Sequence, residues 1–421
     1  MRISATTHVE LSSRQFSWRW LAVSILLLMN TLNFLDRGLL SANAPLLKSE
    51  FHLSNAQYGE MLSAFSLVYA LMAPFAGALL DRIGLLRTVA GAVIVWSMAS
   101  AWTGISRSFG GLLLARCFLG LGEAAALPCS GKGTALYLPS SEWGFSNSVG
   151  SIAVTLGIMT APLLAGFMAP QYGWRSPFLL SGVLGIIWVA LWWRTSTAIG
   201  PDKQMDAAPK MLIARQLRDG RLWLAGGAYA LVMVPYMFWL NWTTIYLVQD
   251  RQVSMSVANR YFVWIPPLLA VFGGFLGGAL AYKWIRQGTQ PLCARLRVCW
   301  ICAPATLATA VVPWVPSTAL AILCIGITLF FCMAVITSLN VVPVDLFGTA
   351  NAGFTTAVLA CSYALLQTFV SPAVGGLLDR TSFGAVCPLL AAFPLLGVIL
   401  LRPLAKTGPD IAGETVMAAH G

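Results

Sequence analysis

The sequence predicts an all-α membrane protein in which twelve transmembrane helices form two six-helix bundles. Three observations lead to this prediction. The chain of 421 residues is 58% hydrophobic and only 10% charged, whereas soluble domains carry about 25% charged residues. Apolar stretches of ~20 residues, the length that crosses a bilayer as a helix, recur along the whole chain. A polar, basic segment at 195–221 separates them into two equal sets.

The apolar stretches follow one another with short polar connections, as expected for closely packed membrane helices. We place the spans at 20–46, 57–80, 88–106, 109–138, 143–168, 176–193, 222–248, 257–282, 292–314, 317–344, 351–377 and 384–402. The resulting parts are an N-terminal tail, a first bundle, a linker, a second bundle and a C-terminal tail, at 1–19, 20–194, 195–221, 222–404 and 405–421.

The two predicted bundles share a pattern of glycine and proline. Its members recur at nearly the same spacing, with Pro162, Gly166, Gly173 and Pro177 matched by Pro372, Gly376, Gly384 and Pro388. Together with the equal division of the spans, the pattern indicates two related bundles. Such repeats place a binding site between the halves, near the middle of the membrane.

The net charge of +11 reflects the orientation of the chain in the membrane. If both termini are cytoplasmic, most Lys and Arg side chains fall on the cytoplasmic side, as the positive-inside rule requires. The densest group lies between the sixth and seventh spans: Arg194, Lys203, Lys210, Arg215, Arg218 and Arg221. The lipid bilayer is therefore an expected partner, and nucleic acid is not.

Two further classes of site are not expected. The nine cysteines lie almost entirely within spans and are interpreted as small buried hydrophobic residues. No cluster of metal ligands and no pairing of a nucleophile with a base emerges, so we expect neither a metal site nor an enzyme.

Charged side chains within the spans are the most informative feature of the chain. All of them belong to the first bundle: Asp36, Arg37, Glu60, Arg116, Glu123 and Lys132. An ionised group costs ~2.5–3.5 kcal/mol at the centre of a membrane helix, so such groups pair with one another or face water. Buried ion pairs add little net stability compared with apolar replacements. A role confined to packing therefore explains Asp36, Arg37, Arg116 and Glu123 poorly. Glu60 is instead expected in water near the outer end of its span, and Lys132 is expected to reach the inner membrane surface or to neutralise a carboxyl group.

Helical spacing predicts how the deep charges are arranged. Asn33 and Arg37 are four residues apart and share one face of the first span. Asp36 lies ~100° around the helix from Arg37, so one of the two should face a cavity and the other a neighbouring helix. Arg116 and Glu123 are seven residues apart and share a face of the fourth span.

These residue types favour a proton-coupled anion carrier. Arginine stays charged and offers a planar fork of donors to a carboxylate. A carboxyl group in a low-dielectric environment favours its neutral form, so it can load and release a proton near neutral pH. In coupled transport, the arginines would thus bind the anion and the carboxyl groups would bind the protons.

The segments that contain these charges resemble the major facilitator superfamily. Gly77-Ala-Leu-Leu-Asp81-Arg82-Ile-Gly84-Leu-Leu-Arg87 is similar to the cytoplasmic loop signature of that superfamily. More narrowly, the chain resembles the anion:cation symporter family, which includes galactonate, hexuronate and phthalate permeases and vesicular organic-anion carriers. The supporting motifs are Asn33-Phe-Leu-Asp36-Arg37, Ser63-Ala-Phe-Ser-Leu-Val-Tyr69, Arg116-Cys-Phe-Leu-Gly-Leu-Gly-Glu123 followed by Pro128, and Gly173-Trp174-Arg175 with Phe178. The likeness is strong over 30–180 and weaker afterwards.

The resemblance assigns roles to individual residues. It implies that Arg37 and Arg116 hold a substrate carboxylate or govern coupling, that Asp36 and Glu123 are protonated, and that Tyr69 hydrogen-bonds the substrate. The loop signature implies a conformational gate formed by Gly77, Asp81, Arg82 and Arg87. Polar groups expected to add to the binding site are Asn33, Asn241, Ser362 and Gln367.

The sequence also departs from the family pattern. Phe34 replaces a common tyrosine, and Trp143 occupies the place of the usual arginine after the fourth span. Positions that contact sugar acids in the galactonate symporter correspond to Ala153 and Ala364. These changes favour a less hydroxylated acid and leave the carboxylate-binding residues intact.

The resulting hypothesis is proton-driven uptake of a small organic anion, such as a sugar acid or another monocarboxylate, by alternating access. Export of an organic acid or drug in exchange for protons is an alternative, and a non-transporting sensor is a remote one, because only a short tail follows residue 402. No cofactor is expected, and sodium remains open as the coupling ion. We expect a monomer in the bacterial inner membrane, with both termini cytoplasmic.

Overall fold

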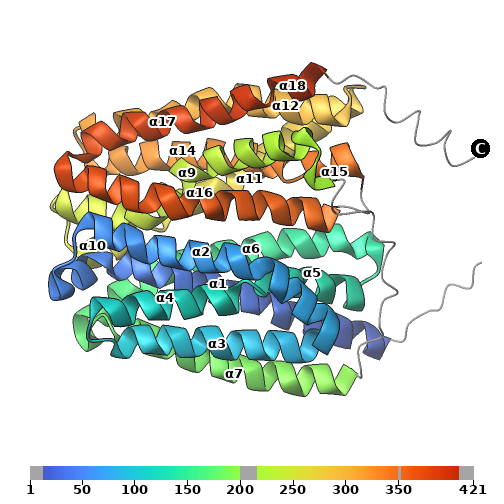
Figure 1. The fold of residues 1–421 in the computed structure, drawn as a ribbon, viewed down its shortest axis with the longest axis horizontal. Coiled ribbons are helices and arrows are strands. Elements are labelled where there is room, and N and C mark those ends of the chain that lie inside the picture. Colours follow the sequence, from blue (N-terminus) through green and yellow to red (C-terminus); the bar gives the residue numbers. More distant parts are fainter. Residues whose placement is uncertain (1–12, 200–215, 349–351, 407–421) are drawn as a thin grey trace, which may run out of the picture.

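The computed structural model describes residues 13–199, 216–348 and 352–406. The described part of the chain is helical, and it contains 12 helices that are long and apolar enough to cross a membrane. Figure 1 shows them lying side by side, with the first and second halves of the chain as two neighbouring groups. The fold class is therefore confirmed. The described residues leave out most of the predicted linker and most of both predicted tails.

Each half of the chain forms one bundle. The first bundle consists of α1 (Ser13–Phe51), α2 (Asn55–Ile83), α3 (Leu85–Ile105), α4 (Phe109–Glu123), α5 (Ala126–Tyr137), η1 (Ser140–Glu142), α6 (Trp143–Tyr172) and α7 (Ser176–Ile199). The second consists of α9 (Gly220–Gln249), α10 (Met255–Val257), η2 (Ala258–Phe262), α11 (Ile265–Arg286), α12 (Pro291–Cys302), η3 (Ala303–Leu307), α13 (Ala308–Val311), η4 (Val312–Trp314), α14 (Thr318–Leu339), α15 (Val342–Phe347), α16 (Ala352–Arg380), α17 (Phe383–Leu400) and α18 (Arg402–Lys406).

Several predicted spans are interrupted in the structure, among them those at 257–282 and 317–344 and the two described next. The span at 109–138 breaks between α4 and α5, directly after Glu123. Pro128 explains the position of the break, because proline has no N–H for the carbonyl four residues earlier, which belongs to Ala124. The span at 292–314 is not one helix but α12 followed by three short turns, which contain Pro304 and Pro313.

Polar side chains define where several helices begin. The Ser54 hydroxyl oxygen accepts a hydrogen bond from the backbone N–H of Gln57, and the Gln57 side-chain oxygen accepts one from the backbone N–H of Ser54. This capping box satisfies two donors at the start of α2. Asp219 caps α9 and pairs with the Arg221 guanidinium at 2.7 Å, and the hydrogen bond from Arg221 lowers the pKa of the Asp219 carboxyl. The cap therefore stays charged at neutral pH.

Glycines allow close helix contact within each bundle. A methyl group on Gly273 would overlap the Phe330 carbonyl of α14, and one on Gly277 would overlap the Ala334 carbonyl. In the first bundle, Gly157 of α6 packs against the Thr31 carbonyl of α1 in the same way. Gly273 and Gly277 thus let α11 pack closely against α14.

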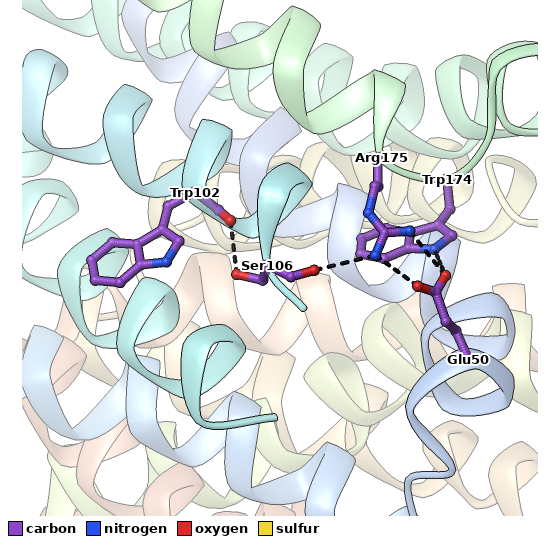
Figure 2. Close-up of polar contacts among 5 residues, drawn as sticks. All are labelled: Glu50, Trp102, Ser106, Trp174 and Arg175. Atoms are coloured by element: carbon purple, nitrogen blue, oxygen red, sulfur yellow. Dashed lines mark hydrogen bonds and ion pairs between the residues drawn. The ribbon is translucent and has the colours of Figure 1, made fainter. Parts of the chain in front are cut away.

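A polar network joins three elements at one end of the first bundle. Arg175 donates to both Glu50 oxygens, at 3.0 and 2.6 Å, and to the Ser106 carbonyl at 3.2 Å. Trp174 also donates to Glu50 (Figure 2). Ser106 donates in turn to the Trp102 carbonyl at 2.8 Å. The Gly173-Trp174-Arg175 motif therefore ties the α6–α7 connection to the ends of α1 and α3.

The two bundles also meet at this end of the molecule. We call it the far end because it lies opposite the end of α7 and the start of α9, which flank the linker (Figure 1). Tyr58 donates to the Asn241 carbonyl at 2.9 Å, and Ser63 donates to the Thr368 carbonyl at 2.6 Å. Asn259 donates to the Ala42 carbonyl at 2.8 Å. Because each bond joins one bundle to the other, the far end is closed.

Gly59 sets how closely the bundles approach at the far end. An added Cβ would overlap the backbone of Ser371 and Pro372 in α16. We therefore expect the valine side chain in Gly59→Val to keep α2 and α16 apart at the far end. Spin labels at the exposed positions Glu60 and Thr381, in a background without the nine native cysteines, should show a longer distance in the variant. Gly91→Val is the control, because the space at Gly91 is open. An unchanged Gly59→Val distance would contradict this role.

Asp379 forms a further contact between the two bundles at the far end. Its two oxygens accept the backbone N–H groups of Asn55 and Ala56, at 2.8 and 2.9 Å, so a residue of α16 caps α2 of the other bundle. Asp379→Asn removes the charge and one acceptor, which should cost about 1 kcal/mol. The same spin-label pair should report an increase of about fivefold in the separated population. A variant that closes as fully as the parent would show that this cap does not hold the bundles together.

Candidate functional site

A cavity of about 200 Å³ lies between the two bundles. Its lining comes from α1, α2, α4, α5 and α6 on one side and from α9, α11, α14 and α16 on the other. This position agrees with the midpoint site that the internal repeat predicts. The charged residues of its lining, Arg37 and Arg116, both belong to the first bundle.

Arg37 is paired with Glu123. Its Nε lies 2.5 Å from Glu123 Oε2, and the ring centroids of Phe34, Phe65 and Tyr69 lie 4.8–5.0 Å from the guanidinium carbon. Glu123 is fully buried, and its second oxygen has no hydrogen-bond partner. The helix break after Glu123 places this carboxylate at the end of α4. The pair thus joins α1 to α4 beside the cavity.

Arg116 has no acidic partner. It is 3% exposed, and its guanidinium carbon lies 5.0 Å from the centroid of the Phe65 ring. Its buried Nε lacks a hydrogen-bond partner, and none of the ion pairs among the described residues includes it. The Glu123 and Asp36 carboxylates act on Arg116 electrostatically, but neither forms an ion pair with it. An anion in the cavity would supply a directly paired negative charge.

Asp36 faces away from the cavity. It is 3% exposed and accepts hydrogen bonds from Ser100 of α3, at 2.6 Å, and from Ser181 of α7. It is absent from the cavity lining, whereas its neighbour Arg37 belongs to it. The prediction that these two side chains point to different surroundings is confirmed.

The other predicted binding residues divide into two groups. Tyr69, Asn241 and Gln367 line the cavity. Asn33 and Ser362 do not; Asn33 is buried with its Nδ2 unpartnered, and Ser362 donates to the carbonyl of Val358 in its own helix at 2.8 Å. The cavity therefore brings together only part of the predicted set.

The predicted gate residues lie near the linker end. Asp81 pairs with Lys132 of α5 at 3.1 Å, and Lys132 also donates to the Leu80 carbonyl at 3.3 Å. Arg82 and Arg87 are exposed, and Gly77 has open space around its Cα. In this structure Lys132 thus neutralises a gate carboxylate within the first bundle.

Sequence reasoning missed several cavity residues. Phe65 lies between the two arginines and contacts both guanidinium groups. Tyr229, Met233 and Met237 line the opposite wall from α9. Their four-residue spacing was visible, but it is equally typical of a packing face. Among the described residues, no group of three or more His, Cys, Asp or Glu side chains is placed to hold a metal ion.

Comparison with known proteins identifies the family. The model of the Major Facilitator Superfamily matches residues 26–369. The chain belongs to this superfamily. It is a membrane transporter and not an enzyme.

Its relatives include several carriers of acids. The "Hexuronate transporter" of Escherichia coli (strain K12) is 26% identical and covers 94% of this chain and 96% of its own length. The "Galacturonate transporter" of Dickeya chrysanthemi is 27% identical over 62% of this chain and 80% of its own. The "Probable sulfoacetate transporter SauU" of Cupriavidus necator (strain ATCC 17699 / DSM 428 / KCTC 22496 / NCIMB 10442 / H16 / Stanier 337) is 24% identical over 92% and 93%.

Solved structures support the same fold. A bacterial homologue of the human lysosomal transporter Spinster, in an inward-facing and unoccupied conformation, superposes with a TM-score of 0.70. It is 22% identical and covers 92% of this chain and 95% of its own. At this identity the similarity concerns the fold alone.

Proposed function

We propose that this transporter takes up a small organic monocarboxylate together with protons. The observation that carries the proposal is the buried Arg116 in the lining of the central cavity, which has no ion-pair partner in the described part of the chain and whose Nε has no hydrogen-bond partner there. The names of its relatives describe carriers of hexuronate, galacturonate and sulfoacetate, which are all organic acids. The site and the relatives thus point to the same class of substrate, an organic anion.

The substrate carboxylate binds at Arg116, with Arg37 beside it. The centroid of the Phe65 ring lies about 5 Å from both guanidinium carbons, so the ring stabilises the two positive charges by cation–π interaction. Arginine offers parallel donors that match the two oxygens of a carboxylate. Tyr69 lines the same part of the cavity and provides a hydroxyl group nearby.

Proton coupling follows from competition for Arg37. With Glu123 ionised, its carboxylate occupies the Arg37 Nε. Protonation of Glu123 neutralises it and releases Arg37 toward the substrate. A proton and an anion therefore bind together, because each binding event favours the other. Asp36 is a second carboxyl group expected to take up a proton, but Ser100 and Ser181 hold it outside the cavity, so its protonation does not release an arginine toward the substrate.

Alternating access gives the two ends of the molecule different roles. The basic linker places its end of the molecule in the cytoplasm by the positive-inside rule. In this orientation the far end faces outward and is closed here. When it opens, Gly77, Asp81, Arg82 and Arg87 gate the cytoplasmic side. A monomer suffices, because the cavity lies between two bundles of one chain.

Uptake by purified protein in proteoliposomes tests the proposal. Pooled labelled carboxylates are supplied under an inward proton gradient, with and without a protonophore. We expect accumulation that the protonophore abolishes. Accumulation that is insensitive to the protonophore but depends on a sodium gradient would show that sodium, and not the proton, is the coupling ion. Substrate loss from preloaded vesicles, without any uptake, would favour export by exchange with protons.

A further inference from the structure

The wall of the cavity that faces the arginines is uncharged. From α9 it receives Tyr229, Met233 and Met237, which recur every four residues and so share one face of the helix. From α16 it receives Ala360 and Ala364, also four residues apart. The site therefore has a cationic side in the first bundle and a largely apolar side in the second.

This wall also contains polar groups in Tyr229, Tyr363 and Gln367, while two other polar side chains already bond within α9. The Asn241 amide donates to the Met237 carbonyl at 2.8 Å, and the Thr243 hydroxyl donates to the Trp239 carbonyl. A substrate with several hydroxyl groups would exchange its bonds to water for contacts with methyl and thioether groups. Each hydroxyl left unpaired weakens binding by about tenfold or more.

Apolar substrate groups fit this wall well. Methionine side chains are flexible and polarizable and contact aromatic rings favourably. The small side chains of Ala360 and Ala364 leave room beside the Tyr363 ring. An aromatic body could then stack against tyrosine while its carboxylate reaches Arg116.

We propose that the transported anion is a monocarboxylate with an aromatic or branched apolar body, and not a polyhydroxylated sugar acid. This inference rests on the proposed function and specifies its substrate class. It also separates this chain from its hexuronate and galacturonate relatives. Met233 and Met237 are the specificity-determining residues.

Competition binding with the purified full-length chain tests this inference. Phenylacetate, glucuronate and acetate compete for the site, where acetate reports carboxylate binding without a tail. We expect phenylacetate to bind at least tenfold more tightly than glucuronate. Glutamine nearly matches methionine in size but adds an amide, so Met237→Gln should weaken phenylacetate about fivefold or more and leave acetate unchanged. Met233→Gln should act in the same direction. Met237→Leu, which stays apolar, should retain the preference.

The outcomes separate this inference from the proposed function. If glucuronate binds as tightly as phenylacetate, or if both glutamine variants keep the parent preference, the apolar substrate class is wrong while carboxylate transport stands. If none of the three carboxylates binds to folded, monodisperse protein, the proposed function fails and this inference fails with it. Arg116→Met should weaken all three ligands together, because it removes the shared carboxylate contact.

Discussion

Replacing Glu123 with glutamine is expected to abolish proton-driven accumulation of the anion while exchange of the anion across the membrane continues. Glutamine has the shape of the protonated carboxyl group, so Arg37 loses its fixed charged partner at every pH. The substrate still binds, but no proton moves with it. With one coupled proton, a gradient of one pH unit drives about tenfold accumulation. In the variant this accumulation should disappear in a proteoliposome uptake assay.

Glu60→Gln is the matched control for this experiment. Glu60 is an exposed carboxylate at the start of α2, away from the cavity lining. Its variant should accumulate substrate like the parent protein. Full accumulation by Glu123→Gln under the same gradient would contradict the proton role of Glu123. Asp36 would then be the carboxyl group to test for proton coupling.

Replacing Arg116 with methionine should abolish substrate binding without destabilising the empty protein. Loss of a buried charge contact to a ligand costs about 2–5 kcal/mol, which corresponds to at least about 30-fold in affinity. In the empty protein, the same change ends the desolvation cost of the buried guanidinium group, and the nearby Glu123 and Asp36 carboxylates, which lose its attraction, can take up a proton instead of staying charged. Thermal unfolding measured with and without ligand should show an unchanged or raised midpoint and no ligand-induced shift.

Arg107→Met is the control for this second experiment. Arg107 is exposed between α3 and α4, so its loss should leave both the unfolding midpoint and the ligand-induced shift unchanged. A normal ligand-induced shift in Arg116→Met would show that the carboxylate binds elsewhere. A strong fall in the midpoint of the empty protein would instead assign Arg116 a structural role.

Hydrophobic length and charge bias were sufficient to predict the number and grouping of the membrane helices. The details that failed concern proline. Pro128, Pro304 and Pro313 interrupt stretches that hydropathy alone reads as continuous helices. The break after Glu123 matters for the site, because it ends α4 at the carboxylate that pairs with Arg37.

Helical periodicity predicted part of the site. It required Asp36 and Arg37 to point in different directions, and the structure shows which of the two lines the cavity. It could not predict that Arg37 pairs with Glu123, because the two residues come from different helices whose relative height depends on packing. Nor could it distinguish the methionines of α9 from packing residues, since both leave the same apolar pattern.

Coupling of one anion to one proton at Arg37, Arg116 and Glu123 is tested most directly by the pH inside proteoliposomes. The vesicles contain a pH-sensitive dye and start without a pH difference. An inward gradient of the transported anion is imposed, and the signal of protein-free liposomes is subtracted to remove passive entry of the neutral acid. We predict that the lumen acidifies with the parent protein and not with Glu123→Gln, although the variant still moves the anion. Anion entry without a pH change, or with alkalinisation, would contradict the account.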